Sequence, residues 1–549
     1  MLSSRFGATP RASITSLSLP LAHACDQEAA EETKVALTTS NVFSRRLTSY
    51  SSASSAQDPS PHVDCNFRLP HLVSRRSRST VAEVGEDAYS NDGKPSGNKY
   101  DRRHFRDIRG ISRTALERLV LHLIDLKEEL PFSSCRVMQR KEGSFHHAVF
   151  LMIEAGHQVT QEYVLKIPAH GTRGEWQIND NVALKSEAQL MQHIWHHTNC
   201  PVPEVIAYDG SLENAIGAPY ILMKKMDGIS AMDMWIGQPY KTTISTKVRL
   251  NADDPLPELE QKRITFLRSL ARAMSELAPL EFEYTGMPAF FDPKNKLPSY
   301  IGPFWRWHTK TVMDKLASEG SFDTSEAFFT AGIDRVNSAE RSSSSGTHDV
   351  AKIGVWIVMR MVMSSAPFAT TESSPSKQTQ SEDVSNGVPI RETFVLRHDD
   401  LDLQNILVDE DGNVTGIIDW DGCAAVPHCL GYASMPTFLR RDWLPNYDIS
   451  RLPHLSWSLD RYRELYAQAM EEVCKSSDAK YTRKSPMYQL VSAALDKDAE
   501  WIDVVEALLH DMPKFRRVDA HAFCRRLGHG WPAAEEVLKA KITKWLKPQ

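Results

Sequence analysis

The alternation of apolar and polar positions predicts helices and strands between residues 106 and 228. Residues 112–126 and 182–197 carry apolar side chains at every third or fourth position, which is typical of helices with one buried face. Residues 148–153, 163–167 and 219–223 are short, almost continuous apolar runs, the pattern of buried strands. We therefore expect a β-rich region that also contains helices.

The rest of the chain has mainly the helical period. Helices are predicted over residues 257–277, 350–363, 459–473, 488–509 and 533–545. Ser- and Thr-rich stretches on both sides of the second of these helices are expected to be surface loops, at residues 338–347 and 370–387. The expected organisation is a mainly helical region over residues 229–549, with flexible insertions around residues 338–390.

The segment from Leu396 to Gly422 combines a predicted hairpin with side chains suited to metal binding and proton transfer. Two β-rich apolar runs enclose a polar stretch with an Asp-Gly pair, which predicts a tight hairpin. The hairpin would bring Asp419 beside Asn405, and a carboxylate together with an amide oxygen suits a hard cation such as Mg²⁺. Asp400 can accept a proton from a hydroxyl group, so the segment holds the groups that phosphoryl transfer needs.

The order and spacing of these residues carry a family resemblance. His398-x-Asp400, then Asn405 and then Ile418-Asp419-Trp420-Asp421 resemble the catalytic segment of aminoglycoside phosphotransferases and choline kinases. The resemblance implies an α+β, protein-kinase-like two-lobe fold, with a β-rich N-terminal nucleotide lobe and a mainly helical C-terminal lobe. It also implies that Asp400 is the catalytic base, that Asn405 and Asp419 bind Mg²⁺, and that His398 supports the loop. The alternative is an acidic surface hairpin that fits the spacing by coincidence.

Two features bear on the substrate that would accept the phosphoryl group. Asp399 and Asp402 stand where the family usually has Gly and often has His, and they place further acidic charge around Asp400. Such crowding raises carboxylate pKa values unless Mg²⁺ or a cationic substrate compensates, which favours a positively charged acceptor. Trp305 and Trp307, in a Pro- and aromatic-rich stretch, either line an acceptor pocket or pack as an ordinary loop.

The resemblance assigns nucleotide-binding residues to the first lobe. Gly143 and Ser144 form a turn between two β-like runs, where backbone N–H groups could cover phosphates, although an ordinary hairpin has the same pattern. Lys166 lies inside an apolar strand, and such a lysine is costly unless it meets an anion. Lys166 matches the strand lysine that holds the α- and β-phosphates in the family. Glu187 is its expected partner, and the alternative is that Glu187 is a solvated helix residue.

The expected hinge between the lobes is residues 224–228. In the resemblance its backbone groups hold the adenine, so Met223 and Lys225 are expected to contact the nucleotide. Lys224 stands where relatives often have an acid, which leaves the preference for ATP or GTP open.

Composition narrows the class of protein. The chain has 549 residues, 41% of them hydrophobic, and a net charge of -6, so nothing in its overall charge suggests a nucleic-acid partner. The 8 Cys residues lack paired metal spacing and are interpreted as reduced thiols of an intracellular protein. The strongest apolar run, residues 353–363, is too short to span a bilayer and contains Arg360.

Residues 1–105 are expected to form a disordered N-terminal tail. They are rich in Ser, Thr, Ala and Arg, which is the composition of a mitochondrial transit peptide, but an acidic cluster at residues 26–32 interrupts the pattern. A low-complexity tail is therefore an equal alternative. The location is accordingly predicted as cytoplasmic or mitochondrial.

These patterns lead to two functional hypotheses. The first is an ATP- and Mg²⁺-dependent kinase that phosphorylates a hydroxyl group of a small molecule. The second is a nucleotide-binding pseudokinase with a scaffold or mitochondrial-maintenance role, because the loop from Glu142 to His147 also resembles that of fungal mitochondrial-inheritance proteins. The presence of every expected catalytic residue favours the enzyme.

Overall fold

The structure is a computed structural model. It describes residues 105–128, 132–143, 145–155, 159–239, 252–304, 320–343, 349–369, 391–444, 447, 454, 456–496 and 499–549. All of these residues belong to one compact unit, Leu69–Gln549. The predicted N-terminal tail, the loop at residues 370–387 and the two tryptophans at 305 and 307 lie outside the described residues.

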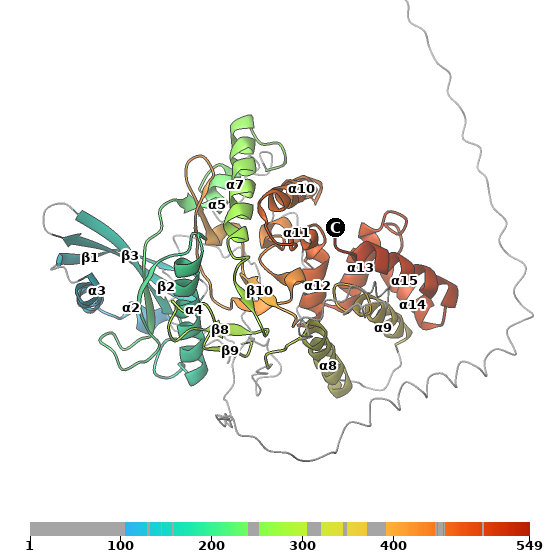
Figure 1. Ribbon diagram of the computed structural model, residues 1–549, viewed down its shortest axis with the longest axis horizontal. Coiled ribbons are helices and arrows are strands. Elements are labelled where there is room, and N and C mark those ends of the chain that lie inside the picture. Colours follow the sequence, from blue (N-terminus) through green and yellow to red (C-terminus); the bar gives the residue numbers. More distant parts are fainter. Residues whose placement is uncertain are drawn as a thin grey trace, which may run out of the picture. The chain divides into compact units, whose positions relative to one another are not determined.

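The N-terminal lobe is built on a five-stranded antiparallel sheet (Figure 1). Its strand order is β1-β2-β3-β5-β4, with the bounds Phe132–Glu142, His146–Ala155, Val159–Pro168, Tyr220–Lys224 and Val205–Asp209. Helices α2 (Phe105–Arg109) and α3 (Arg113–Glu128) precede the sheet, and α4 (Ile178–His197) lies between β3 and β4 in the chain. The expected β-rich lobe is confirmed.

Helix α3 packs on the sheet with the apolar face that the sequence predicted. Leu116, Val120 and Ile124 are buried in the same cluster as Val149 and Leu165 of the sheet. Their spacing of four residues places them on one side of the helix, so a single face is removed from water.

The remainder of the described chain is mainly helical. Its helices are α5 (Ala231–Ile236), α7 (Pro257–Ser275), α8 (Ser325–Ser343), α9 (Val350–Met363), α10 (Ser456–Val473), α11 (Ala479–Thr482), α12 (Ser485–Leu495), α13 (Trp501–Asp511), α14 (Ala520–Gly528) and α15 (Pro532–Leu546). Together with the sheet they give the two-lobe α+β organisation expected from the sequence. Within the described ranges, none of the helices has the length and apolar character needed to cross a membrane.

Three details differ from the sequence-based prediction. The helix expected over residues 488–509 is two helices, because Glu500 and Asp503 form a capping box that starts α13 anew. The loop expected at residues 338–347 is helical up to Ser343, where α8 ends. The Pro- and aromatic-rich stretch contains a hairpin of β8 (Met287–Ala289) and β9 (Tyr300–Gly302).

Two small antiparallel sheets hold the segment that carries the candidate site. One has the order β13-β10-β7, formed by Ala424–Val426, Phe394–Arg397 and Glu281–Phe282. The other has the order β12-β11-β6, formed by Val414–Ile417, Ile406–Val408 and Ile229–Ser230. The loop between β10 and β11 and the loop between β12 and β13 are thereby each fixed at both ends.

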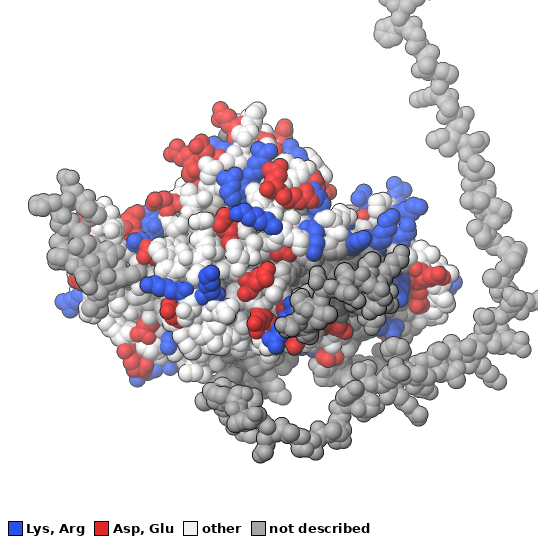
Figure 2. Space-filling model, in the orientation of Figure 1, with Lys and Arg blue, Asp and Glu red and all other residues white. Residues whose placement is uncertain are grey.

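Charges of both signs are spread over the surface. On the face shown in Figure 2, Lys and Arg side chains lie among Asp and Glu side chains, in keeping with the net charge of -6.

Candidate active site

The hairpin predicted in the segment Leu396–Gly422 is present and places Asp419 next to Asn405. Strands β11 and β12 pair with Ile406 opposite Ile417, and the backbone N–H of Ile418 donates to the carbonyl oxygen of Asn405 at 2.9 Å. Asp419 follows directly with φ 63°, and it is the one non-glycine residue with a positive φ among those described. A left-handed conformation at a non-glycine residue is strained and is often associated with a functional position.

Lys166 lies between two carboxylates that come from different parts of the chain. Its Nζ is 2.7 Å from Oε1 of Glu187 on α4 and 2.6 Å from Oδ1 of Asp419. Burial by itself lowers the pKa of Lys166, but the charges and hydrogen bonds of Asp419 and Glu187 outweigh it and raise that pKa. The lysine is therefore fully protonated and can bind an anion such as a phosphate group.

Asp400 is held by the residue that was predicted to bind the metal. The side-chain Nδ2 of Asn405 donates to the backbone oxygen of Asp400 at 2.9 Å and to its Oδ2 at 3.1 Å. The amide oxygen of Asn405 is then the atom that remains for a cation, which fits the preference of Mg²⁺ for oxygen ligands.

Burial, together with the crowding of acidic residues that the sequence predicted, raises the pKa of Asp400 to about 7. Burial is the largest cause, and the negative charges of Asp402, Asp399 and Asp419 add to it, while Arg441 acts in the opposite direction. A carboxylate whose pKa lies near neutral pH is a better general base than one with a pKa near 4.

Arg441 neutralises Asp402, a contact that was not predicted from the sequence. One guanidinium nitrogen of Arg441 lies 2.8 Å and 2.6 Å from the two carboxylate oxygens of Asp402, and both side chains are buried. Asp402 Oδ1 also accepts the backbone N–H of Leu403 at 2.8 Å, at the start of a 3₁₀ turn, η3 (Leu403–Asn405). The sequence signal was present, because the charged run at residues 440–442 interrupts an otherwise apolar and aromatic stretch.

His398 is buried and contacts the backbone directly before Asp419. Its Nε2 lies 3.1 Å from the carbonyl oxygen of Ile418, so this nitrogen carries the proton, and its ring packs edge-on against Trp420 with centroids 4.8 Å apart. Burial lowers the pKa of His398, which keeps the imidazole neutral. The geometry fits the supporting role that the resemblance implied.

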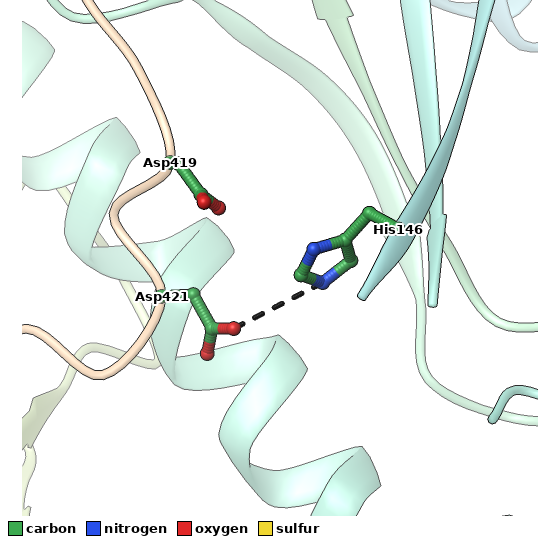
Figure 3. Close-up of side chains that lie close together, drawn as sticks. All are labelled: His146, Asp419 and Asp421. Atoms are coloured by element: carbon green, nitrogen blue, oxygen red, sulfur yellow. Dashed lines mark ion pairs between the residues drawn. The ribbon is translucent and has the colours of Figure 1, made fainter. Parts of the chain in front are cut away.

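The loop between β1 and β2 reaches over the carboxylates of the site. The backbone N–H of Gly143 donates to the carbonyl oxygen of His146 at 2.9 Å and so closes a tight turn; Ser144 lies outside the described residues. His146 Nε2 is 3.9 Å from Oδ2 of Asp421, and Figure 3 shows its ring directed toward Asp419 and Asp421. One ligand atom from each of these three residues lies within 4.8 Å of the other two.

This arrangement gives Asp421 a place in the site that the sequence had left unassigned. Mg²⁺ prefers oxygen ligands, so Asp421 joins Asn405 and Asp419 as a candidate ligand, whereas an imidazole suits other metals better. His146 brings the loop close to the two carboxylates.

The base of the same loop is fixed by an ionic group. Arg109 donates to both carboxylate oxygens of Glu142, at 2.7 Å and 2.6 Å, and His147 Nδ1 donates to Oε1 of Glu142 at 3.0 Å. Burial lowers the pKa of His147, which stays neutral as a donor. The helix before the sheet thereby ties down the loop that was predicted to cover the phosphates.

The expected hinge residues are held mainly by the sheet. Met223 is buried in β5, opposite Val164 of β3. Lys225 forms an ion pair with Glu162, and its backbone N–H donates to the carbonyl oxygen of the same residue at 2.9 Å. The N–H of Lys225 is therefore already bonded, and a contact of Met223 or Lys225 with a nucleotide stays a prediction.

The segment that contains the candidate catalytic residues matches a known family. The model of the phosphotransferase enzyme family matches residues 379–465, which include His398, Asp400, Asn405 and Asp419. The resemblance predicted from the sequence is confirmed for this segment.

Two curated proteins from Aspergillus fumigatus match a short part of the chain. Each is a Subtelomeric hrmA-associated cluster protein, one per strain, and is 33% identical over 97 residues. The match covers 17% of this chain and 17% of each relative. The chain thus matches well under two thirds of the length of these relatives.

Solved structures also show a likeness. A thermostable mutant of aminoglycoside phosphotransferase APH(4)-Ia, in a ternary complex with AMP-PNP and hygromycin B, is 16% identical, with 75% of this chain and 97% of that chain covered and a TM-score of 0.34. An ethanolamine kinase of Plasmodium vivax is 10% identical, with 72% and 82% covered and a TM-score of 0.29.

Proposed function

We propose that this chain, whose residues 379–465 match the phosphotransferase enzyme family, is an ATP- and Mg²⁺-dependent kinase that phosphorylates a hydroxyl group of a small molecule. One observation supports this most strongly. Lys166 and Asp419 are 253 positions apart in the sequence, and yet the lysine forms ion pairs with both Asp419 and Glu187. A cation-binding carboxylate and a phosphate-binding lysine at one point are what phosphoryl transfer requires.

In the proposed reaction Asp400 acts on the acceptor. Its carboxylate accepts the proton of the acceptor hydroxyl while the oxygen of that hydroxyl attacks the γ-phosphorus of ATP. The bond between this phosphorus and the β,γ-bridging oxygen breaks, and ADP leaves. The proton on Asp400 then passes to solvent, which a pKa of about 7 permits at neutral pH.

Other residues bind and orient the nucleotide. Lys166 contacts the phosphates, and Glu187 holds the lysine in place from α4. Asn405 and Asp419, with Asp421 beside them, would hold Mg²⁺, which when bound neutralises charge on the phosphate oxygens. These residues supply positioning and electrostatic stabilisation rather than covalent chemistry.

The surroundings of Asp400 favour a cationic acceptor. The carboxylates of Asp399, Asp400, Asp402, Asp419 and Asp421 lie in the same site. Arg397 pairs with Asp399, Lys166 with Asp419 and Arg441 with Asp402, so negative charge remains in excess of these three cations. An ammonium group on the acceptor would offset this charge, as in an amino alcohol or an amino sugar.

The experiment is Mg²⁺-dependent ADP release by the full-length protein, screened with amino alcohols, sugars and aminoglycosides. We expect stimulation by one cationic compound and its loss in Asp400→Asn, since the amide cannot accept the proton. Full turnover in Asp400→Asn would contradict the assignment of the base. Nucleotide binding without turnover for any compound would instead indicate the pseudokinase.

A further inference from the structure

A hairpin of the C-terminal lobe contacts α4, the helix that carries Glu187. Phe290, directly after β8, is fully buried, and its backbone N–H donates to Oε1 of Gln189 at 3.1 Å. Its ring stacks on that of His193 with centroids 3.8 Å apart and planes 12° apart. These contacts combine one directed hydrogen bond with buried aromatic packing, so they fix both the position and the angle of the helix.

The tip and the second strand of the hairpin add further contacts. His193 Nδ1 and His197 Nε2 lie 3.1 Å and 3.2 Å from the carbonyl oxygen of Pro293, and because a carbonyl only accepts, both nitrogens donate. Burial lowers the pKa of His193 to about 4, so its ring is a neutral donor at physiological pH. Burial raises the pKa of Tyr300 of β9, and the nearby side chain of Ser186 acts in the opposite direction.

All of these contacts lie on one face of α4. Ser186, Gln189, His193 and His197 are spaced by three or four residues, which places their side chains in one row along the helix. Glu187 is the next residue after Ser186, about 100° further around the helix axis. Because the hairpin fixes the rotation of α4 about its axis, it also fixes the direction in which Glu187 points.

The base of the hairpin is attached to the other side of the site. The backbones of Gly286 and Ala425 exchange two hydrogen bonds, of 2.9 Å and 2.7 Å, and Ala425 lies in β13, the strand that follows Asp419 and Asp421. Gly286 has φ 133°, and a Cβ atom there would lie 2.2 Å from the carbonyl oxygen of Gly302. This close approach requires glycine.

We propose that the hairpin of β8 and β9 is a positioning element for Glu187, with Gln189 and His193 as the positioning residues; this inference rests on the proposed function. A closed ring of contacts supports it. The ring runs from Asp419 through Lys166 and Glu187 to α4, and then through the hairpin to β13 and back to the loop of Asp419. The hairpin thus couples the orientation of the phosphate-binding lysine to the segment that carries the metal-binding carboxylates.

The test compares two glutamines of the same helix in the full-length protein. Gln189→Ala removes the bond to the hairpin, and Gln192→Ala is the matched control, since Gln192 Nε2 bonds the carbonyl oxygen of Val205 in the N-terminal sheet at 3.3 Å. Gln189 also donates to the hydroxyl of Tyr208 at 3.2 Å, so Tyr208→Phe measures that contact alone. His193→Phe keeps a ring on Phe290 and removes the donor to Pro293.

Two quantities are measured: amide hydrogen exchange across α4 and the hairpin, and the dissociation constant of an ATP analogue. We expect Gln189→Ala and His193→Phe each to speed exchange in both elements about fivefold, and to raise the dissociation constant by about the same factor, the size expected for one buried hydrogen bond. The two control variants should leave exchange in the hairpin unchanged. Thermal unfolding verifies that every variant is folded.

The outcomes separate this inference from the proposed function. Equal changes in Gln189→Ala and Gln192→Ala would indicate general stability of the helix and overturn the positioning role, as would unchanged exchange in the hairpin. Faster exchange with an unchanged dissociation constant would also overturn it. If the wild-type protein binds no ATP analogue, the proposed function fails, and with it the role for Glu187, whereas exchange would still report whether the hairpin holds α4.

Discussion

Arg441 places one guanidinium nitrogen 2.6 Å and 2.8 Å from the two carboxylate oxygens of Asp402, with both side chains buried. Asp402 is two residues from the proposed base, and its backbone N–H donates to the carbonyl oxygen of Asp400 at 2.9 Å. The ion pair therefore anchors the loop that carries Asp400 to the 3₁₀ helix η6 (Arg441–Trp443), in the C-terminal lobe. The ion pair also explains how Asp402, which stands where the family often has His, is tolerated in this loop.

Arg441→Ala should destabilise the protein strongly. The change leaves the carboxylate of Asp402 buried without its partner, and breaking a buried pair in this way typically costs about 3–5 kcal/mol. Denaturant unfolding measures the loss of unfolding free energy. Adding Asp402→Asn to Arg441→Ala removes the buried charge and should restore part of the stability; a loss below about 1 kcal/mol in the single variant would show that the pair is not buried in solution.

The activity should rise with pH through neutrality. The proposed base works only as a carboxylate, and its pKa is raised to about 7, mainly by burial. The pH profile of kcat/KM for the acceptor should therefore increase up to about pH 7 and level off above it. A profile already flat from pH 5 upward would mean that Asp400 ionises like an ordinary exposed aspartate.

The same group should make stability depend on pH in the opposite sense. Asp400 has a pKa of about 7 in the folded protein, above the ordinary aspartate value of 3.8 that it has when unfolded, so the folded state binds the proton more tightly. The contribution of Asp400 to the free energy of unfolding is fully present below pH 3.8 and is lost as the pH rises to about 7. Asp400→Asn should thus be more stable than wild type at pH 8, with the difference shrinking toward pH 4; equal differences at both pH values would contradict the shift.

Glu187→Ala should weaken nucleotide use without unfolding the protein. Glu187 forms a charge-assisted hydrogen bond with Lys166 at 2.7 Å, and such bonds contribute about 1.5–3 kcal/mol. We expect kcat/KM for ATP to fall roughly 10- to 150-fold, mainly through a higher KM, in steady-state assays. Glu213→Ala, at an exposed position between β4 and β5, is the control and should change kcat/KM less than twofold.

A substitution distant from the site should affect stability alone. A Cβ atom at Gly354 in α9 would lie 1.8 Å from the carbonyl oxygen of Cys524 in α14, and one at Gly528 would lie 1.9 Å from that of Val350. Gly354→Ala should therefore destabilise the protein by about 1–3 kcal/mol or more through overpacking. Gly320→Ala is the control, because a Cβ atom there meets nothing within 4 Å, and it should leave the stability nearly unchanged. Thermal unfolding of both variants measures the difference.

The sequence was sufficient where partners are close in the chain. The hairpin of β11 and β12 was predicted, because its turn residues and its two apolar runs lie within a few positions of each other. The predicted hairpin also gave the proximity of Asn405 and Asp419. The crowding of acidic charge around Asp400 was predicted as well, because Asp399 and Asp402 are its neighbours in the chain. The periodic helices α3, α4, α7 and α9 were also predicted, since each is specified by its own apolar face.

Predictions failed where local period and tertiary context disagree. Residues 488–509 have a continuous apolar pattern, but the capping box at Glu500 starts a second helix. The end of α8 is rich in Ser and reads as a loop, yet the helix continues to Ser343. Propensity is a weak signal at helix ends, where capping and packing decide the boundary.

Other features were decided by the tertiary structure alone. Residue type, spacing and the family resemblance nominated Lys166, Glu187, Asp400, Asn405 and Asp419, but only packing brings Lys166 to Asp419 and Arg441 to Asp402. The contact between the hairpin of β8 and β9 and helix α4 also depends on tertiary packing and was not predicted from the sequence. Contacts between distant segments cannot be predicted from the period of apolar residues. They depend on how two elements, each specified by its own local sequence, pack against each other in the folded chain.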